Sequence, residues 1–197
     1  RRYHSLEEAV SILEGSSLQE KALKWALAAL DILADAESRV HDVPKSRAHF
    51  HEVGALDALA DIAGSCEAAS SLKADRILSR PVSVGGGYVQ SAHGLLPVPG
   101  PAALEILRAH NIPWIGGPVD DELLTPTGAA LLAALVDEFV PRFPLIQAVK
   151  VGYGAGRKDL ATPNLLRTLE AKVISPTRGA GMDHQMDRVV QLETNVD

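Results

Sequence analysis

The spacing of apolar residues predicts that the chain begins with helices. After residue 20, leucine and alanine recur at three- and four-residue intervals, the period of an amphipathic helix, and this pattern ends near Val40. The tetrapeptides SLEE (5–8) and SLQE (17–20) both place glutamate three residues after serine, as in a capping box at a helix start. A third apolar stripe predicts a helix from about Val53 to Leu72.

Strand-like segments follow the third helix. Residues 76–84 (RILSRPVSV) are rich in β-branched side chains and are followed by three glycines, so we expect one strand there. Residues 145–156 (LIQAVKVGYGAG) indicate a strand that runs into a glycine loop, and another strand is expected from Asp187 onward. Residues 163–174 fit either a strand or a helix, and the pattern leaves both open.

Two shorter helices are predicted between these strands. Pro101 suits the first turn of a helix, where a residue without an N–H group is accepted, and Thr125 followed by Pro126 has the form of an N-cap and first helical residue. Helices first, then strands alternating with helices, indicate an α/β or α+β fold built around a mixed sheet.

Composition and charge exclude several classes of protein. The 197 residues carry 25 acidic and 19 basic side chains, and the formal net charge of −6 argues against general binding to nucleic acid. Aromatic residues make up only 4%, too few for a base-stacking platform. No apolar run reaches the roughly 18 residues that a membrane-spanning helix needs. The single cysteine, Cys66, allows no internal disulfide, suits a reducing cytoplasm and falls on the apolar side of its helix.

The segment HFHEVGALDALAD (49–61) has the residue types of a transition-metal site. His49 and His51 point the same way if the backbone before the helix is extended, because side-chain direction then repeats every two residues. Asp57 and Asp61 are four residues apart on the predicted helix, so their carboxylates repel unless a cation or donor lies between them. Imidazole and carboxylate together suit nickel, zinc or manganese.

A simpler interpretation of this segment is also open. Glu52 is favoured near a helix N-terminus by the helix dipole alone, and the aspartates can contact solvent or basic side chains instead of a metal. The spacing does not decide between the two.

Two further segments have features of an anion site. Thr125 and Thr127 bracket a helix N-terminus, where unpaired N–H groups favour anions, although ordinary capping by Thr125 explains the same pattern. The loop GYGAGRKDL (152–160) places Arg157 and Lys158 after three glycines, a combination that can bind phosphate or carboxylate. A flexible loop with solvated charges is the alternative.

Other polar candidates are weaker. The glycine run 85–87 lacks the spacing of a dinucleotide fingerprint and the lysine of a P-loop, so a tight turn or a bulge is the default. His93, taken alone, is more often a hydrogen-bonded loop histidine than a base or ligand. Four histidines lack acidic or glycine-loop company and are left out: His4, His41, His110 and His184.

Four stretches taken together resemble successive signatures of the LarC family of nickel insertion proteins. They are HFHEVGALDALADIAG, SAHGLLPVPGPAALEIL, LTPTGAALL and GYGAGRKDLATPNLLR, in that order. The resemblance runs from about Ala48 to ETNVD (193–197), which resembles the opening of that family's C-terminal domain. LarC proteins complete the nickel-pincer nucleotide cofactor of lactate racemase.

The resemblance implies a nickel insertase, a lyase-class cyclometallase that uses CTP to place nickel in a pyridinium bisthiocarboxylate mononucleotide. Nickel would end bound by two sulfurs and a ring carbon that has lost its proton. The candidates from the residue pattern match the needs of this reaction, and four of them would hold or hand on the metal: His49, His51, Asp57 and Asp61. Glu52 or His93 would accept the ring proton. The phosphate would face Thr125, Thr127, Gly128, Gly154, Gly156, Arg157 and Lys158.

The resemblance also implies a division of the chain. Residues 1–186 correspond to the N-terminal LarC-like domain, without the strand and FDPFSGISGDM-type loop that normally open it. Residues 187–197 correspond to the start of a truncated C-terminal domain, on which CTP and manganese or magnesium are expected to bind. We therefore expect this fragment to be inactive.

The expected partners are the mononucleotide substrate and the lactate racemase apoenzyme, which would receive the cofactor. We expect no binding to nucleic acid or membrane, and a location in the cytoplasm. A homo-oligomer is left open. Two other functions also stay open: a non-catalytic nickel-delivery or assembly module, and a metal-dependent phosphate-ester hydrolase.

Overall fold

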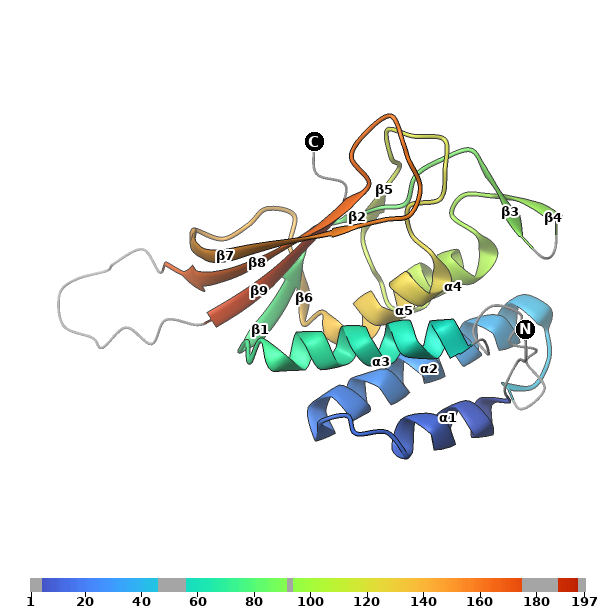
Figure 1. The fold of residues 1–197 in the computed structure, drawn as a ribbon. Helices are drawn as coiled ribbons and strands as arrows, with labels where there is room; N and C mark the ends of the chain where they lie inside the picture. Colours follow the sequence, from blue (N-terminus) through green and yellow to red (C-terminus); the bar gives the residue numbers. More distant parts are fainter. Residues whose placement is uncertain (1–4, 46–55, 92–93, 175–187, 195–197) are drawn as a thin grey trace.

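The computed structural model describes residues 5–45, 56–91, 94–174 and 188–194, which form five helices and a mixed β-sheet (Figure 1). The helices are α1 (Leu6–Glu14), α2 (Glu20–His41), α3 (Leu56–Ser71), α4 (Pro101–Ala109) and α5 (Pro126–Leu135). The strands are β1 (Arg76–Ser79), β2 (Val82–Ser83), β3 (Tyr88–Ser91), β4 (Gly94–Pro97), β5 (Trp114–Ile115), β6 (Glu138–Phe139), β7 (Ile146–Ala155), β8 (Leu165–Val173) and β9 (Arg188–Thr194). The predicted α/β class with a mixed sheet is confirmed.

The main sheet has the strand order β6-β1-β9-β8-β7. β1 pairs in parallel with both β6 and β9, whereas β9, β8 and β7 are successively antiparallel. β2 and β5 form a separate parallel pair, and β3 and β4 form an antiparallel hairpin. β9 therefore lies inside the sheet; the domain boundary at residue 187 stays a prediction.

Most of the hydrophobic core lies between the helices and one face of the sheet (Figure 1). α2 is the central helix and contacts α1, α3, α4 and α5. Ile77 and Val190 belong to this helical core, while their neighbours Leu78 and Val189 belong to a small second cluster. This alternation follows from the two-residue period of a strand. Among the helices described, none is both long and apolar enough to cross a membrane.

The two predicted capping boxes have different outcomes. At α1 the box is confirmed: the Glu8 N–H donates to Ser5 Oγ and the Ser5 N–H donates to Glu8 Oε2, both at 3.1 Å. The SLQE box at α2 is wrong, because the N-cap is Gln19 and has no side-chain cap. Glu67 of α3 instead accepts from the Gln19 N–H (3.1 Å) and from its Nε2 (2.8 Å). A contact between helices has replaced the local one.

The single strand predicted over 76–84 is also wrong. β1 ends at Ser79 and β2 begins at Val82, and the two strands belong to different sheets. Pro81 lies in the break, and proline cannot donate a hydrogen bond to a sheet ladder. The segment 163–174, which fitted strand or helix, contains β8, and the strand expected after Asp187 is β9.

Candidate functional site

A cavity of about 370 Å³ lies between the first turns of α3 and α5. We call it the α3–α5 cleft. Its walls are Asp57, Ala58 and Asp61 from α3, and Thr125, Pro126, Thr127, Gly128 and Leu131 from α5 and its N-cap. The fold therefore brings the predicted metal-binding carboxylates and the predicted anion site to one place, although they are far apart in the sequence.

Asp57 and Asp61 lie one helical turn apart, and both are exposed. Asp57 Oδ1 also accepts from the Ala58 N–H at 3.2 Å. A second aspartate pair with the same spacing, Asp31 and Asp35 on α2, shows how such a pair binds a cation: Lys45 Nζ lies 2.6 and 2.8 Å from the two carboxylates. The spacing on α3 is therefore suited to a small cation.

The first turn of α5 has the predicted N-cap. Thr125 Oγ1 accepts from the Gly128 N–H at 3.2 Å, and Thr125 O accepts from the Ala129 N–H at 2.9 Å. Pro126 has no N–H. An anion bound at this helix end would therefore meet the N–H and hydroxyl of Thr127 first.

The glycine loop between β7 and β8 is not part of the lining of the α3–α5 cleft as described. Gly152 and Gly154 lie within β7, where they pair with Thr168 and Leu166 of β8, so the prediction that these glycines form a loop is wrong. Gly156 follows the strand, and its N–H donates to Asn164 O at 2.8 Å, which closes the loop. Lys158 Nζ pairs with Asp121 Oδ1, and this hydrogen bond is the main cause of a lowered pKa at Asp121. Arg157 is exposed. Phosphate binding by this loop stays a prediction.

The glycine run 85–87 does not form the expected tight turn; Gly85 forms an isolated antiparallel bridge with Glu122 instead. Gly85 and Gly87 have φ values of +88° and +67°, and the Gly86 N–H donates to Asp121 O at 3.3 Å. A Cβ on Gly85 would overlap that same carbonyl oxygen. The glycines therefore let the loop that carries Asp121 pack against the end of β2. This loop, the glycine run and the β7–β8 loop gather at one end of the molecule (Figure 1).

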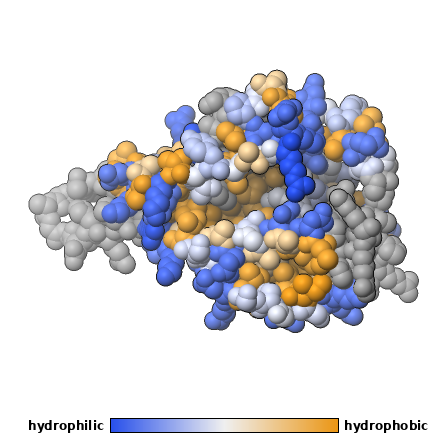
Figure 2. All heavy atoms as spheres, in the orientation of Figure 1, coloured by the Kyte–Doolittle hydropathy of each residue, from blue (hydrophilic) through white to orange (hydrophobic). Residues whose placement is uncertain are grey.

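A second, mostly apolar cavity of about 430 Å³ adjoins the α3–α5 cleft and shares Thr125, Gly128 and Leu131 with it. Residues of α3, α5 and the segments next to them line one side, and Ile77, Leu166, Thr168 and Val190 of the sheet line the other. Figure 2 shows an apolar hollow on this face, between the helices and the strands above them.

Comparison with known proteins decides the family. The family model described as nickel insertion protein matches residues 1–197. The chain belongs to the nickel insertion (LarC) family. A putative nickel insertion protein of Methanothrix thermoacetophila is 55% identical over 199 residues, which cover all of this chain and 48% of the relative.

Two other relatives in the family give the same picture. A putative nickel insertion protein of Dictyoglomus thermophilum is 39% identical and covers 99% of this chain and 48% of its own length. The pyridinium-3,5-bisthiocarboxylic acid mononucleotide nickel insertion protein of Clostridium kluyveri is 40% identical. The match covers 98% of this chain and 46% of that relative. The chain spans about half the length of these relatives. No solved structure matches it.

Four predicted site residues of this LarC-family chain lie outside the described residues: His49, His51, Glu52 and His93. In the part of the chain that the structure describes, no three His, Cys, Asp or Glu side chains are grouped closely enough to hold a metal ion. Metal binding by His49 and His51 together with Asp57 and Asp61 therefore stays a prediction.

Sequence reasoning missed His41. Its Nε2 lies 3.3 Å from Glu37 Oε2 on the same helix, and both residues line a third cavity. The signal was present, because Glu37 and His41 have the i,i+4 spacing that places two side chains together on a helix. The statement that His41 lacks acidic company was wrong.

Proposed function

We propose that this chain forms the nickel- and nucleotide-binding part of a nickel insertase whose substrate is a pyridinium-3,5-bisthiocarboxylic acid mononucleotide. Family membership and the name of the C. kluyveri relative support this proposal. The observation that carries it is the α3–α5 cleft, where the Asp57 and Asp61 carboxylates and the N-terminus of α5 line one cavity. A divalent cation and a phosphate group require these two kinds of surface.

Nickel is the cargo of this reaction. Asp57 and Asp61 would hold it with His49 and His51, a set of oxygen and imidazole donors that suits nickel without binding it through sulfur. The substrate offers two thiocarboxylate sulfurs, which are softer donors. Transfer would therefore run from the oxygen and nitrogen ligands of the protein to the sulfur ligands of the nucleotide.

The carbon–nickel bond requires a base. The ring C–H bond breaks, its electron pair forms the bond to nickel(II), and the proton passes to Glu52 or His93, so no change of oxidation state is needed. The phosphate would contact Thr127 at the start of α5, with Thr125 and Gly128 shaping that turn. Arg157 and Lys158, the cations of the β7–β8 loop, would also face the phosphate. Gly154 and Gly156, which precede them in the sequence, would let the backbone come close to it.

The remaining features of the proposal concern the whole protein. CTP with manganese or magnesium would bind in the other half of the longer family members, and this chain alone would be inactive. The overall reaction would be of the lyase class and cytoplasmic. Lactate racemase would receive the finished cofactor.

The first experiment tests nickel binding by calorimetry. The double variant Asp57→Asn/Asp61→Asn should lose nickel binding and keep its helical circular dichroism, because only charge is removed. The matched control is Asp31→Asn/Asp35→Asn, which removes the same charges from the pair that binds Lys45 and should retain nickel affinity. Unchanged nickel affinity in the Asp57/Asp61 variant would refute the metal assignment.

The second experiment separates nickel from nucleotide. Replacing both Arg157 and Lys158 with alanine should weaken nucleotide binding and leave nickel uptake intact. Loss of both together would indicate misfolding. If the unmodified chain binds nickel and no nucleotide, it is a delivery module, and the insertase proposal is wrong.

A further inference from the structure

The third cavity, of about 310 Å³, lies between the last turns of α2, the β3–β4 hairpin and the start of α4. We call it the α2–α4 cavity. It shares Pro126 with the α3–α5 cleft, so the two adjoin at the first turn of α5. Its polar lining is Glu37, His41, Gln90, Ser91 and Glu122, and its apolar lining includes Val40, Val89, Leu96 and Ala102.

Glu37 is an unusual residue for a cavity wall. Its side chain is only 9% exposed, and an ionisable group is rarely so buried without a partner or a function. His41 Nε2, 3.3 Å away, holds the carboxylate in place. A carboxylate has about four acceptor positions. A carboxylate with several acceptor positions can accept a hydrogen bond from a ligand alongside the contacts that it already makes.

Glu122 brings a second carboxylate to the same cavity from a different element. Its Oε1 lies 3.7 Å from the position of a Cβ at Gly100, the N-cap of α4. Gly100 has no side-chain cap, and the positive end of the helix dipole favours a carboxylate there. Glu37 and Glu122 therefore present carboxylate oxygens to the same cavity from two different elements.

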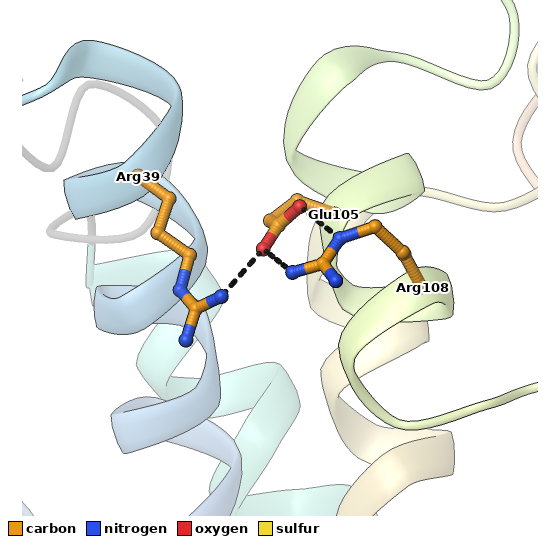
Figure 3. Close-up of polar contacts among 3 residues, drawn as sticks. All are labelled: Arg39, Glu105 and Arg108. Atoms are coloured by element: carbon orange, nitrogen blue, oxygen red, sulfur yellow. Dashed lines mark hydrogen bonds and ion pairs between the residues drawn. The ribbon is translucent and has the colours of Figure 1, made fainter.

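The two helices that form the walls are joined by an ion cluster (Figure 3). Glu105 of α4 accepts from Arg39 of α2 at 3.2 Å and from Arg108 at 2.7 and 2.9 Å. Arg39 lies between Glu37 and His41 in the sequence. The cluster therefore links α2 and α4, the two helices that line the cavity.

We propose that the α2–α4 cavity binds the ribose of the mononucleotide, with Glu37 and Glu122 accepting hydrogen bonds from its vicinal hydroxyls. This inference rests on the proposed function. A ribose has a hydroxyl edge and apolar faces, which match the carboxylates and the valine, leucine and alanine walls. Carboxylates recognise ribose hydroxyls in other nucleotide-binding folds. The ribose is bonded to the phosphate, so its cavity must adjoin the phosphate site.

Position and size also fit a sugar. The volume is at the lower end of the roughly 300–1,000 Å³ of ligand pockets. A metal ion is the other ligand that a His–Glu cavity suggests. It is disfavoured because the described residues contain no group of three potential ligands.

The test uses nicotinamide mononucleotide, which contains phosphate, ribose and a pyridinium ring, and its 2′,3′-dideoxy form. The chain should bind the ribose form about tenfold more tightly, the factor that about 1.4 kcal/mol gives. Glu37→Gln and Glu122→Gln should each reduce this ratio toward one, because they weaken binding of the ribose form alone. The control Glu20→Gln removes a carboxylate at the opposite, exposed end of α2 and should keep the ratio.

Each outcome has one meaning. Equal affinity of the unmodified chain for the two nucleotides overturns the ribose assignment and leaves the proposed function standing. Binding of neither nucleotide overturns both. If the Glu37→Gln variant loses nickel binding and keeps its nucleotide binding, the cavity is a metal site and the ribose assignment is wrong. Because the two ligands are compared on the unmodified chain, this test does not depend on whether any variant folds.

Discussion

Replacing Gly85 with alanine should destabilise the protein more than the same change at Gly94. Both glycines have a positive φ, +88° and +96°, which costs alanine about 1–2 kcal/mol. A Cβ on Gly85 would also overlap Asp121 O, a backbone atom that no side-chain rotation can move, whereas nothing described lies within 4 Å of a Cβ on Gly94. Moving that loop adds about 1–3 kcal/mol, the scale of an overpacked core.

We therefore expect unfolding free energies to fall by about 2–5 kcal/mol for Gly85→Ala and about 1–2 kcal/mol for Gly94→Ala. Urea titrations followed by circular dichroism measure both. Gly64→Ala completes the series: Gly64 lies inside α3 with nothing described within 4 Å of its Cβ, so alanine should add up to about 1 kcal/mol. Equal midpoints for the Gly85 and Gly94 variants would refute the packing of the Asp121 loop on Gly85.

Three more predictions concern the core and its charges. Ile62→Ala, at a fully buried position, should cost about 2–5 kcal/mol in the same urea assay. Burial raises the pKa of the Cys66 thiol to about 11, so iodoacetamide at pH 8 should alkylate it only after unfolding, and rapid labelling of the native protein would contradict its burial. The Arg108 hydrogen bond lowers the pKa of Glu105 below its usual 4.5, so this contact stabilises the fold above pH 4.5 and is lost as pH falls through the lowered pKa. In Glu105→Gln the thermal unfolding midpoint should fall less steeply as the pH is lowered. An unchanged pH dependence of the midpoint would refute the contribution of this contact.

The sequence predicted best those features that depend on neighbouring residues. The α1 capping box and the Thr125–Pro126 helix start are local arrangements, and both are present. The SLQE box failed because Glu67, distant in the sequence, outcompetes the local cap of α2. The break at Pro81 was missed because strand pairing is decided by partners that the local pattern does not contain.

The same limit applies to the candidate site. The four-residue spacing of Asp57 and Asp61 places them on one helical face, and this was predicted from the sequence. Their meeting with the first turn of α5 depends on helix packing, which no local spacing reveals. The pairing of Lys158 with Asp121 is likewise a contact between two loops. His41 is different, since its partner Glu37 lies one turn away and could have been recognised.

The central place of β9 has a consequence for biosynthesis. β1 is made early, yet its partner on one side, β9, is made more than a hundred residues later and must enter between β1 and β8. While a ribosome is still translating, the helices can collapse on one another, but the interior of the sheet stays open until residues 188–194 leave the exit tunnel. Such long-range closure is slow. Until then the growing chain exposes the unpaired edges of β1 and β8, and a chaperone that shields them would raise the yield of folded protein.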